Sequence, residues 1–217
     1  MTCFVRFAFV QNLPAMIQIK DFIDRFSDLF PDHSHMQPWE ITEQLTDMLN
    51  KMITKLDTTY TISEGIAVHE SAVIEEGAVL KGPVIVSENC YIGAHAYLRG
   101  PVFLGNSVRI GPGCELKQSV IFDHTAIAHF NYIGNSLIGS HVNFEAGAIA
   151  ANHFNERADK KIPVMYKGEL IQTGIEKFGA LVGDGSKIGA NAVLSPGTIL
   201  EKGSVVGRLE LIDQLKR

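Results

Sequence analysis

Apolar residues recur every six positions through the middle of the chain. The leading apolar positions are Val68, Ile74, Leu80, Val86, Ile92, Leu98, Leu104, Ile110, Leu116, Phe122 and Ala128. An amphipathic helix repeats every 3.6 residues and does not match this spacing. Short strands joined by tight polar corners do match it. Three hexapeptides close one triangular coil, so the pattern predicts a parallel β-helix in which residues eighteen apart stack on one another.

The repeat is interrupted once in its second half. The period shortens to five at Ile133 and Ile138, returns through Phe144 and Ala150, and then stops. Residues 152–177 carry no repeat, and we expect an excursion from the coil, of the kind that usually carries function. The repeat resumes at Val182 and continues to Val206. Because the open end of a solenoid needs a cap, we expect a terminal helical turn after it.

Two helices are expected ahead of the repeat. The first has an apolar stripe formed by Ile19, Phe22, Ile23, Phe26, Leu29 and Phe30. The second has a similar stripe from Ile41 to Leu56, with Pro38 at its start, where proline is favoured. The predicted fold is therefore mainly β, with an N-terminal helical segment at 1–60, a β-helix domain at 61–208 and a C-terminal cap at 209–217.

Composition and charge exclude several classes of protein. The 217 residues carry a net charge of −5, whereas a nucleic-acid-binding protein usually has a basic face. No apolar run is long enough to span a bilayer, and the opening MTCFVRFAFV lacks the charged start of a signal peptide. Cys3, Cys90 and Cys114 form no CxxC pair, which is typical of a reducing compartment. We expect a cytoplasmic protein without nucleic-acid or membrane partners, in which Cys90 and Cys114 point into the coil.

Arg99 and Lys117 are candidates for a phosphate clamp. Both follow a leading apolar residue and are eighteen residues apart, so they are expected to stack in adjacent coils. Two like charges held together cost free energy unless an anion joins them. The alternative is that both are solvated surface cations. His129 is expected at the equivalent corner position, where a neutral imidazole suits removal of a proton from an amine. From position alone, a lone histidine is more often structural.

The stretch ELKQSVIFDHTAIAHFNYIGNSLIGSHVNFEAGAIAANHF resembles a known family of hexapeptide-repeat enzymes. It looks like the acetyltransferase half of the bifunctional N-acetylglucosamine-1-phosphate uridyltransferase/glucosamine-1-phosphate acetyltransferases. The excursion and the coils after it look more like the archaeal-type sugar-1-phosphate nucleotidyltransferases. The resemblance covers about residues 66–206 and implies a left-handed parallel β-helix that assembles as a homotrimer. It also implies transfer of an acetyl group from acetyl-CoA, as co-substrate and without a metal, to an amino-sugar phosphate.

The same resemblance implies roles for individual residues. His129 matches the catalytic base of the family, Arg99 and Lys117 match its phosphate-binding residues, and Tyr132 and Asn143 match residues that orient the sugar. Lys161 is the expected loop lysine that contacts substrate, with Lys160 and Lys167 as competitors. The acetyl-CoA contacts are expected at Ala146, Asn152 and His153. The amine is expected to attack the thioester directly, in a ternary complex.

The sequence also departs from this family. Residues 1–65 contain no Gly-rich nucleotide loop, so nucleotidyl transfer is not expected. Glu145 stands where the family usually has a glycine, and Asp184 stands where it has a serine that contacts CoA.

The sequence leaves two alternatives to acetyl transfer. A γ-type carbonic anhydrase needs three zinc-binding histidines, and His124 and His129 show its five-residue spacing. The third ligand would fall on Glu88, however, and His95 is out of phase. His33 and His35 are too few for a zinc site on their own. The second alternative is a non-catalytic β-helix that assembles with a nucleotidyltransferase, which would not need the polar residues above in register.

Overall fold

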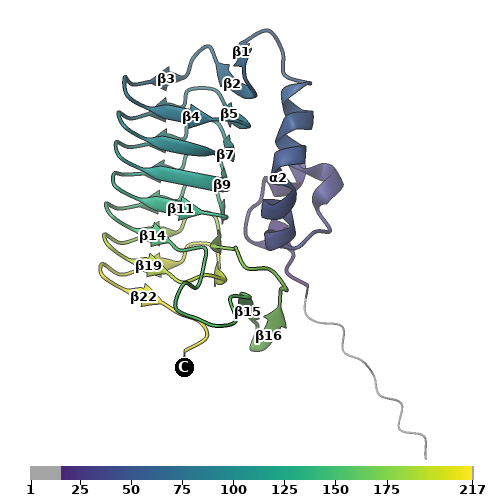
Figure 1. The fold of residues 1–217 in the computed structure, drawn as a ribbon, viewed down its shortest axis with the longest axis vertical. Coiled ribbons are helices and arrows are strands. Elements are labelled where there is room, and N and C mark those ends of the chain that lie inside the picture. Colours follow the sequence, from purple (N-terminus) through teal and green to yellow (C-terminus); the bar gives the residue numbers. More distant parts are fainter. Residues whose placement is uncertain (1–15, 217) are drawn as a thin grey trace, which may run out of the picture.

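The computed structural model describes residues 16–216 and shows a left-handed parallel β-helix with a helical segment along one side (Figure 1). Cys3 and the apolar opening of the chain lie outside the described residues. No helix in the described part of the chain is long and apolar enough to cross a membrane.

Each coil contributes strands to three faces. The first face carries β3 (Val73–Ile74), β6 (Tyr91–Ile92), β8 (Arg109–Ile110), β10 (Ala126–Ile127), β13 (Asn143–Phe144), β18 (Lys187–Ile188) and β21 (Val205–Val206). The second face carries β4 (Val79–Lys81), the first halves of β7 (Tyr97–Leu104) and β9 (Glu115–Ile121), β11 (Tyr132–Gly134), β14 (Ile149–Ala150), β19 (Val193–Leu194) and β22 (Leu211–Ile212). The third face carries β2 (Ile66–His69), β5 (Val84–Val86), the second halves of β7 and β9, β12 (Leu137–Ile138), β17 (Ala180–Val182) and β20 (Thr198–Leu200).

The three corners are named by the faces that they join. The first corner leads from the first to the second face, the second corner from the second to the third, and the third corner back to the first. β1 (Tyr60–Ser63) pairs antiparallel with β2 and closes the N-terminal end of the coil.

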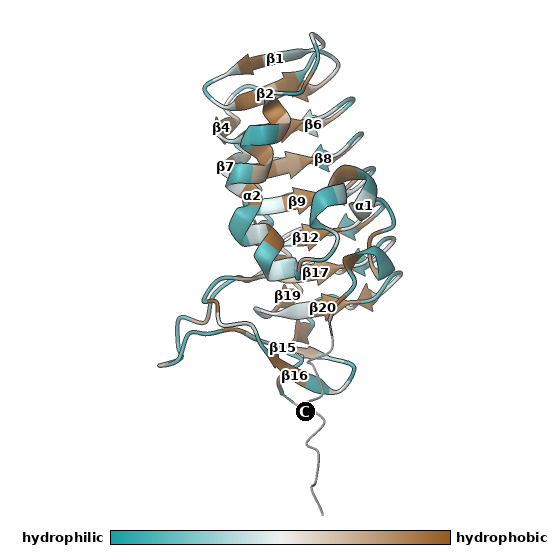
Figure 2. Ribbon diagram, turned by 90° about the vertical axis from the view of Figure 1, so that its right-hand side faces the viewer, coloured by the Kyte–Doolittle hydropathy of each residue, from teal (hydrophilic) through white to brown (hydrophobic). Residues whose placement is uncertain are grey.

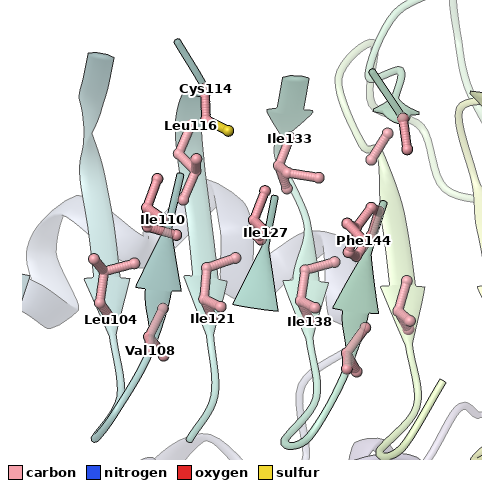
Figure 3. Close-up of a cluster of buried hydrophobic side chains, with 14 of the residues drawn as sticks. Leu104, Val108, Ile110, Cys114, Leu116, Ile121, Ile127, Ile133, Ile138 and Phe144 are labelled. Atoms are coloured by element: carbon pink, nitrogen blue, oxygen red, sulfur yellow. The ribbon is translucent and has the colours of Figure 1, made fainter. Parts of the chain in front are cut away.

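The interior of the coil is filled by stacked apolar side chains from all three faces (Figure 3). Cys90 and Cys114 lie among them, each with 1% of its surface exposed, which confirms their predicted inward orientation. Burial raises the pKa of both thiols, that of Cys90 to about 11. Neither thiol is placed to react with a soluble substrate.

The predicted inward positions at Phe122 and Ala128 are wrong by one residue. Ile121 and Ile127 point inward instead (Figure 3). The register between β7 and β9 shifts after Arg99, so that Leu104 pairs with Ile121, seventeen residues further on. This coil is one residue shorter than the coil before it, and the short coil moves the inward phase from that point onward.

The third face carries a second apolar layer on its outer side. Ile85, Phe103, Val120, Leu137, Leu181 and Ile199 point away from the coil interior and are all buried. Helix α2 (Pro38–Ile53) lies across this face and turns its apolar side toward it (Figure 2). Pro38 begins the helix, and Gln37 and Glu40 form a capping box there. The second predicted helix is confirmed, and its role is to cover this face.

The first predicted helix is broken into three short turns: η1 (Ile19–Asp21), α1 (Phe26–Leu29) and η2 (Pro31–His33). The backbone between η1 and α1 binds the coil instead of continuing a helix. The Asp184 N–H donates to the Phe22 carbonyl at 2.9 Å, and the Asp24 N–H donates to the Asp184 carboxylate at 2.9 Å. The apolar stripe is nevertheless buried, because the turns point Phe22, Phe26 and Phe30 toward the third face.

Residues 152–177 form an excursion, as predicted, and it contains secondary structure of its own. An antiparallel hairpin joins β15 (Pro163–Tyr166) and β16 (Glu169–Gln172) and lies beside the lower coils (Figure 1). The Tyr166 ring lies 6.1 Å from that of Phe22. At the C-terminus β22 continues the coil as a strand that pairs with β19. A single turn follows it, in which the Lys216 N–H donates to the Asp213 carbonyl at 3.1 Å.

Candidate functional site

Arg99 and Lys117 lie side by side on adjacent coils at the second corner. They are Cα partners in the parallel pair β7–β9, which confirms the stacking predicted from their spacing. Lys81 is the partner of Arg99 one coil earlier, so the three cationic residues form one column. The second corner therefore carries one positively charged side chain from each of three successive coils.

The expectation that both cations lack a partner is wrong for Arg99. Its Nη1 lies 2.7 Å from Oε1 of Glu115, which stands two residues before Lys117 on the same strand. A carboxylate of the protein thus already neutralises part of the charge. No carboxylate of the described residues lies within 4 Å of the Lys117 ammonium, so Lys117, unlike Arg99, has free capacity for an anion.

Lys117 also has a cationic neighbour that the sequence did not indicate. Its pKa is lowered by burial, then by the charge of Lys177, and then by that of Arg99. Two backbone hydrogen bonds place Lys177 here: the Gly179 N–H donates to the Asn135 carbonyl at 2.9 Å, and the Asn135 N–H donates to the Lys117 carbonyl at 2.8 Å. Lys177 ends the excursion, and only the way the loop returns to the coil brings it to this corner.

A cavity of about 260 Å³ opens beside these cations, between helix α2 and the second corner. It is lined by Glu43, Gln118, Asn135, Glu176 and Lys177. The Gln118 amide donates to the Thr42 carbonyl at 2.9 Å, which fixes the start of α2 against the coil. The N-terminal segment therefore forms one wall beside the candidate site.

Tyr132 and Asn152 complete the cluster at the second corner. Tyr132 pairs with Glu115 across β9 and β11. Burial and the charge of Glu115 raise the pKa of Tyr132, while Arg99 and a hydrogen bond with Asn152 lower it. Both side chains lie over Gly134, where a Cβ atom would come 2.6 Å from the Tyr132 hydroxyl and 2.7 Å from the Asn152 amide nitrogen. The glycine leaves room for these two side-chain ends, and a Cβ atom at this position would shift them.

His129 lies at the first corner, at the opposite end of the second face, and the predicted equivalence with Arg99 and Lys117 is wrong. Arg99 and Lys117 directly follow inward residues, whereas His129 comes two residues after the inward Ile127. The imidazole is exposed, and its ring centroid is 5.8 Å from that of Phe130. Its carbonyl accepts hydrogen bonds from the Gly147 N–H at 3.0 Å and from the Asn131 amide at 3.1 Å.

Ala146 lies one coil beyond His129 at the same corner. At two other coils of this corner a carboxylate binds the equivalent N–H group: Ala94 donates to Glu75 at 2.7 Å, and Ala190 donates to Glu145 at 2.9 Å. No described group accepts a hydrogen bond from the Ala146 N–H. This donor next to His129 is therefore available to a carbonyl or oxyanion.

Of the remaining predicted site residues, Asn143 and Lys161 lie away from the second-corner cluster, whereas His153 directly follows Asn152 and contacts Glu176 in the cavity wall. Asn143 is exposed on the first face, between Ala126 and Lys187 in register. Lys161 is exposed in the excursion, and its backbone N–H donates to Asp159 at 3.0 Å. Lys160 is half-buried in the same loop, and the Lys167 ammonium lies 5.0 Å from the centre of the Tyr166 ring. The His153 imidazole is 3.3 Å from the Glu176 carbonyl.

The two departures from the family pattern have structural explanations. The Glu145 carboxylate accepts two hydrogen bonds from Arg208, at 2.8 and 2.9 Å, and one from the Ala190 N–H. These contacts lower the pKa of Glu145 to about 2. The Asp184 carboxylate accepts hydrogen bonds from the Ser140 and Asp24 N–H groups, at 2.7 and 2.9 Å. Both carboxylates connect segments that are distant in the sequence.

Two histidines outside the candidate site form a pair at the third corner. The rings of His124 and His141 are stacked with centroids 4.9 Å apart, and both are exposed. Among residues 16–216 there is no group of three histidine, cysteine, aspartate or glutamate side chains that could hold a metal ion.

Two family profiles and several known proteins are similar to this chain. One family profile, described as the GMPPB C-terminal domain, matches residues 80–154, and another, the hexapeptide repeat of succinyl-transferase, matches residues 179–207. A bifunctional protein GlmU of Methanococcus maripaludis strain C7 is 40% identical over 183 residues, 81% of this chain and 43% of that protein. A bifunctional sugar-1-phosphate nucleotidylyltransferase/acetyltransferase of Sulfurisphaera tokodaii is 40% identical over 84 residues, 38% of this chain and 20% of that protein. The chain thus spans less than half of the length of these relatives.

Among solved structures, a mutant of GDP-perosamine N-acetyl transferase from Caulobacter crescentus, in complex with CoA and GDP-perosamine, aligns with a TM-score of 0.33. The alignment has 15% identity and covers 64% of this chain and 50% of that chain. A TM-score of this size supports no argument about function.

Proposed function

Because the chain is a hexapeptide-repeat protein folded as a left-handed parallel β-helix, we propose that it is an acetyltransferase that acts on an amino-sugar phosphate. In this proposal the acetyl group comes from acetyl-CoA and the acceptor is the amine of the sugar. The observation that carries the proposal is the cluster of Arg99, Lys117, Tyr132 and Asn152 at one corner of the coil. These side chains come from three successive coils and the start of the excursion, and a purely structural coil does not need them together.

The cluster suits a phosphate group on the acceptor. Lys117 has a lowered pKa because burial and two neighbouring cations disfavour its charged form, and a bound anion would relieve that cost. Arg99 is paired with Glu115, so a phosphate would compete with this carboxylate for the guanidinium. Lys177 adds a third positive charge from the end of the excursion. We assign the phosphate to these three cations, and we keep Lys161 as a further candidate for contact with the sugar.

The chemistry in this proposal belongs to the first corner. The amine of the sugar attacks the thioester carbonyl, a carbon–nitrogen bond forms, and His129 accepts the proton that the nitrogen releases. The tetrahedral intermediate then collapses, the carbon–sulfur bond breaks, and the CoA thiolate leaves and takes up a proton. The free Ala146 N–H is suited to stabilise the oxyanion. Tyr132 and Asn143 would orient the sugar, and Ala146, Asn152 and His153 would contact acetyl-CoA.

The acetyl group passes directly to the amine in this scheme. Cys90 and Cys114 are buried inside the coil with raised pKa values, so neither can carry an acyl group from CoA. We further propose that the protein works as a cytoplasmic homotrimer, in which neighbouring chains complete the acetyl-CoA site.

The test is an acetyl-transfer assay on a panel of amino-sugar phosphates. The protein is incubated with acetyl-CoA and each sugar, and the CoA thiol that is released is measured with a thiol reagent. We expect release with phosphorylated amino sugars and little with the same sugars lacking phosphate. Arg99→Ala should raise KM for the sugar phosphate and leave KM for acetyl-CoA nearly unchanged. If no sugar of the panel releases thiol, the proposed activity is refuted.

A further inference from the structure

Asn131 is a polar residue at a position of the coil that is otherwise small and apolar. In the five coils between the two end coils, the inward residue before the strand of the second face is Ala96, Cys114, Asn131, Ala148 or Ala192, and each of these is at most 2% exposed. An amide in such a place costs free energy unless all of its polar atoms are paired. Cysteine in the coil before and alanine in the coil after fill the same position at no such cost.

The pairing of the Asn131 amide is incomplete. Its Nδ2 donates to the His129 carbonyl at 3.1 Å, and the same atom lies 3.9 Å from the sulfur of Cys114. Its Oδ1 is buried and has no hydrogen-bond partner among the described residues. Turning the amide over would place an oxygen against the His129 carbonyl, so the observed orientation is the favourable one. The coil therefore contains an unpaired Asn131 oxygen. The hydrogen bond that Asn131 makes in this orientation is the one to the His129 carbonyl.

That contact matters because, among the described residues, the His129 side chain has a ring contact with Phe130 but no hydrogen bond to hold it. The imidazole makes no hydrogen bond and is exposed, so its position depends on the backbone of its corner. Phe130, the next residue, has a positive φ of 56°. The His129 carbonyl is held by the Gly147 N–H from the following coil and by Asn131 from the interior. Removal of Asn131 would leave one of these two anchors.

We propose that Asn131 is a positioning residue that fixes the His129 corner so that the imidazole meets the amine of the acceptor. This inference rests on the proposed acetyl transfer. It explains why one coil retains a buried amide where its neighbours have alanine or cysteine. Buried polar atoms without a partner are expected at functional sites, where a precise arrangement of side chains is kept although it lowers local stability.

The central experiment is a double-mutant cycle between Asn131→Ala and His129→Ala. Asn131→Ala should fold with an unchanged or higher Tm, because alanine is the usual residue of this position. We expect kcat to fall about tenfold with little change in either KM, because a misplaced catalytic group lowers turnover steeply. In the His129→Ala background the same substitution should have no further effect, since Asn131 acts through His129. Thr125→Val, which removes a buried hydroxyl bonded to the Gly139 carbonyl at the third corner, is the matched control.

Two outcomes would overturn the proposal. One is full turnover of Asn131→Ala, and the other is an equal loss of turnover with and without His129, as a purely structural role predicts. If Asn131→Ala does not fold, Asn131→Cys takes its place, because cysteine occupies this position one coil earlier. The NMR resonances of the His129 ring should shift or broaden in the variant and remain unchanged in Thr125→Val. This readout applies even if the wild-type protein transfers no acetyl group, so failure of the proposed function and failure of this inference can be told apart.

Discussion

Lys117→Met should stabilise the free protein and remove its response to phosphate. In the folded chain the Lys117 ammonium is partly desolvated and faces Lys177 and Arg99. Methionine retains most of the aliphatic side chain and removes the charge. Relief of unfavourable charge interactions near a surface is typically about 0.5–1 kcal/mol. For a chain of this length that corresponds to an increase in Tm of roughly 1–4 °C.

The pH dependence follows from the direction of the pKa shift. The pKa of Lys117 is lowered in the folded state, so the folded protein gains stability from this group only above the ordinary lysine pKa of about 10.4. That contribution is lost as the pH falls through the lowered pKa, and at neutral pH the charged side chain is a net cost. The difference in Tm between Lys117→Met and the wild type should therefore be present at pH 7 and shrink as the pH approaches 10.

Binding of a sugar phosphate should reverse the order of Tm between the wild type and Lys117→Met. A sugar phosphate at a hundred times its Kd adds about 2.7 kcal/mol to the free energy of unfolding of the wild type. This is roughly 5–11 °C in Tm for a chain of this length. Lys117→Met should respond far less, so the wild type becomes the more stable protein in saturating ligand. Differential scanning fluorimetry with a sugar 1-phosphate and with the unphosphorylated sugar measures both effects.

Lys187→Met is the matched control for this prediction. Lys187 is an exposed lysine on the first face, away from the second corner. Its substitution should leave both the Tm of the free protein and the response to phosphate unchanged. A lower Tm for free Lys117→Met, or a full response to sugar phosphate in that variant, would refute the assignment of Lys117 to an anion site.

Three further predictions concern the base, the coil interior and a cross-coil ion pair. His129→Ala should lower kcat by about a hundredfold and leave KM for acetyl-CoA nearly unchanged, and full turnover in steady-state assays would exclude His129 as the base. Cys90 and Cys114 should resist thiol reagents until denaturant is added, and rapid labelling of the native protein would contradict their buried positions. Arg208→Ala should lower Tm at neutral pH. Because the pKa of Glu145 is held at about 2, the difference from wild type should vanish as the pH falls from about 4 to 2, and a constant difference would exclude this ion pair as its source.

The six-residue period of the sequence predicted the coiled fold correctly. It predicted the wrong inward residues after the coil that is one residue shorter. Counting in steps of six passes any error in one step on to the next. Because one residue fewer lies between Leu116 and the next inward residue, Ile121, the count reached Phe122 and Ala128 instead of Ile121 and Ile127. Ile121 and Phe122 are both apolar, so hydropathy alone could not show which of the two points inward. In the structure Ile121 fills the coil interior and Phe122 packs beneath the helical segment.

The candidate site was predictable only in part, for a related reason. The stacking of Arg99 and Lys117 follows from a fixed coil length and is confirmed. The Glu115 ion pair was missed because it depends on the direction of a side chain, which spacing does not determine. Lys177 was missed because the excursion carries no repeat, so no register indicated where its last residues return. The catalytic role of His129 and the substrate contacts remain predictions.

The excursion begins and ends at the same place on the coil. The Phe178 N–H donates to the Asn152 carbonyl at 3.2 Å, so the two ends of the loop are tied together. The strands on either side stack as if the loop were absent, since β12 pairs directly with β17 and β14 with β19. Insertions and deletions within the loop need not disturb the register of the solenoid. The coil register therefore does not depend on the length of the loop. The inner side of the loop is nevertheless part of the fold, because Phe154, Ile162 and Tyr166 are buried in the apolar layer on the third face, so only its exposed residues are free to vary without a cost in stability.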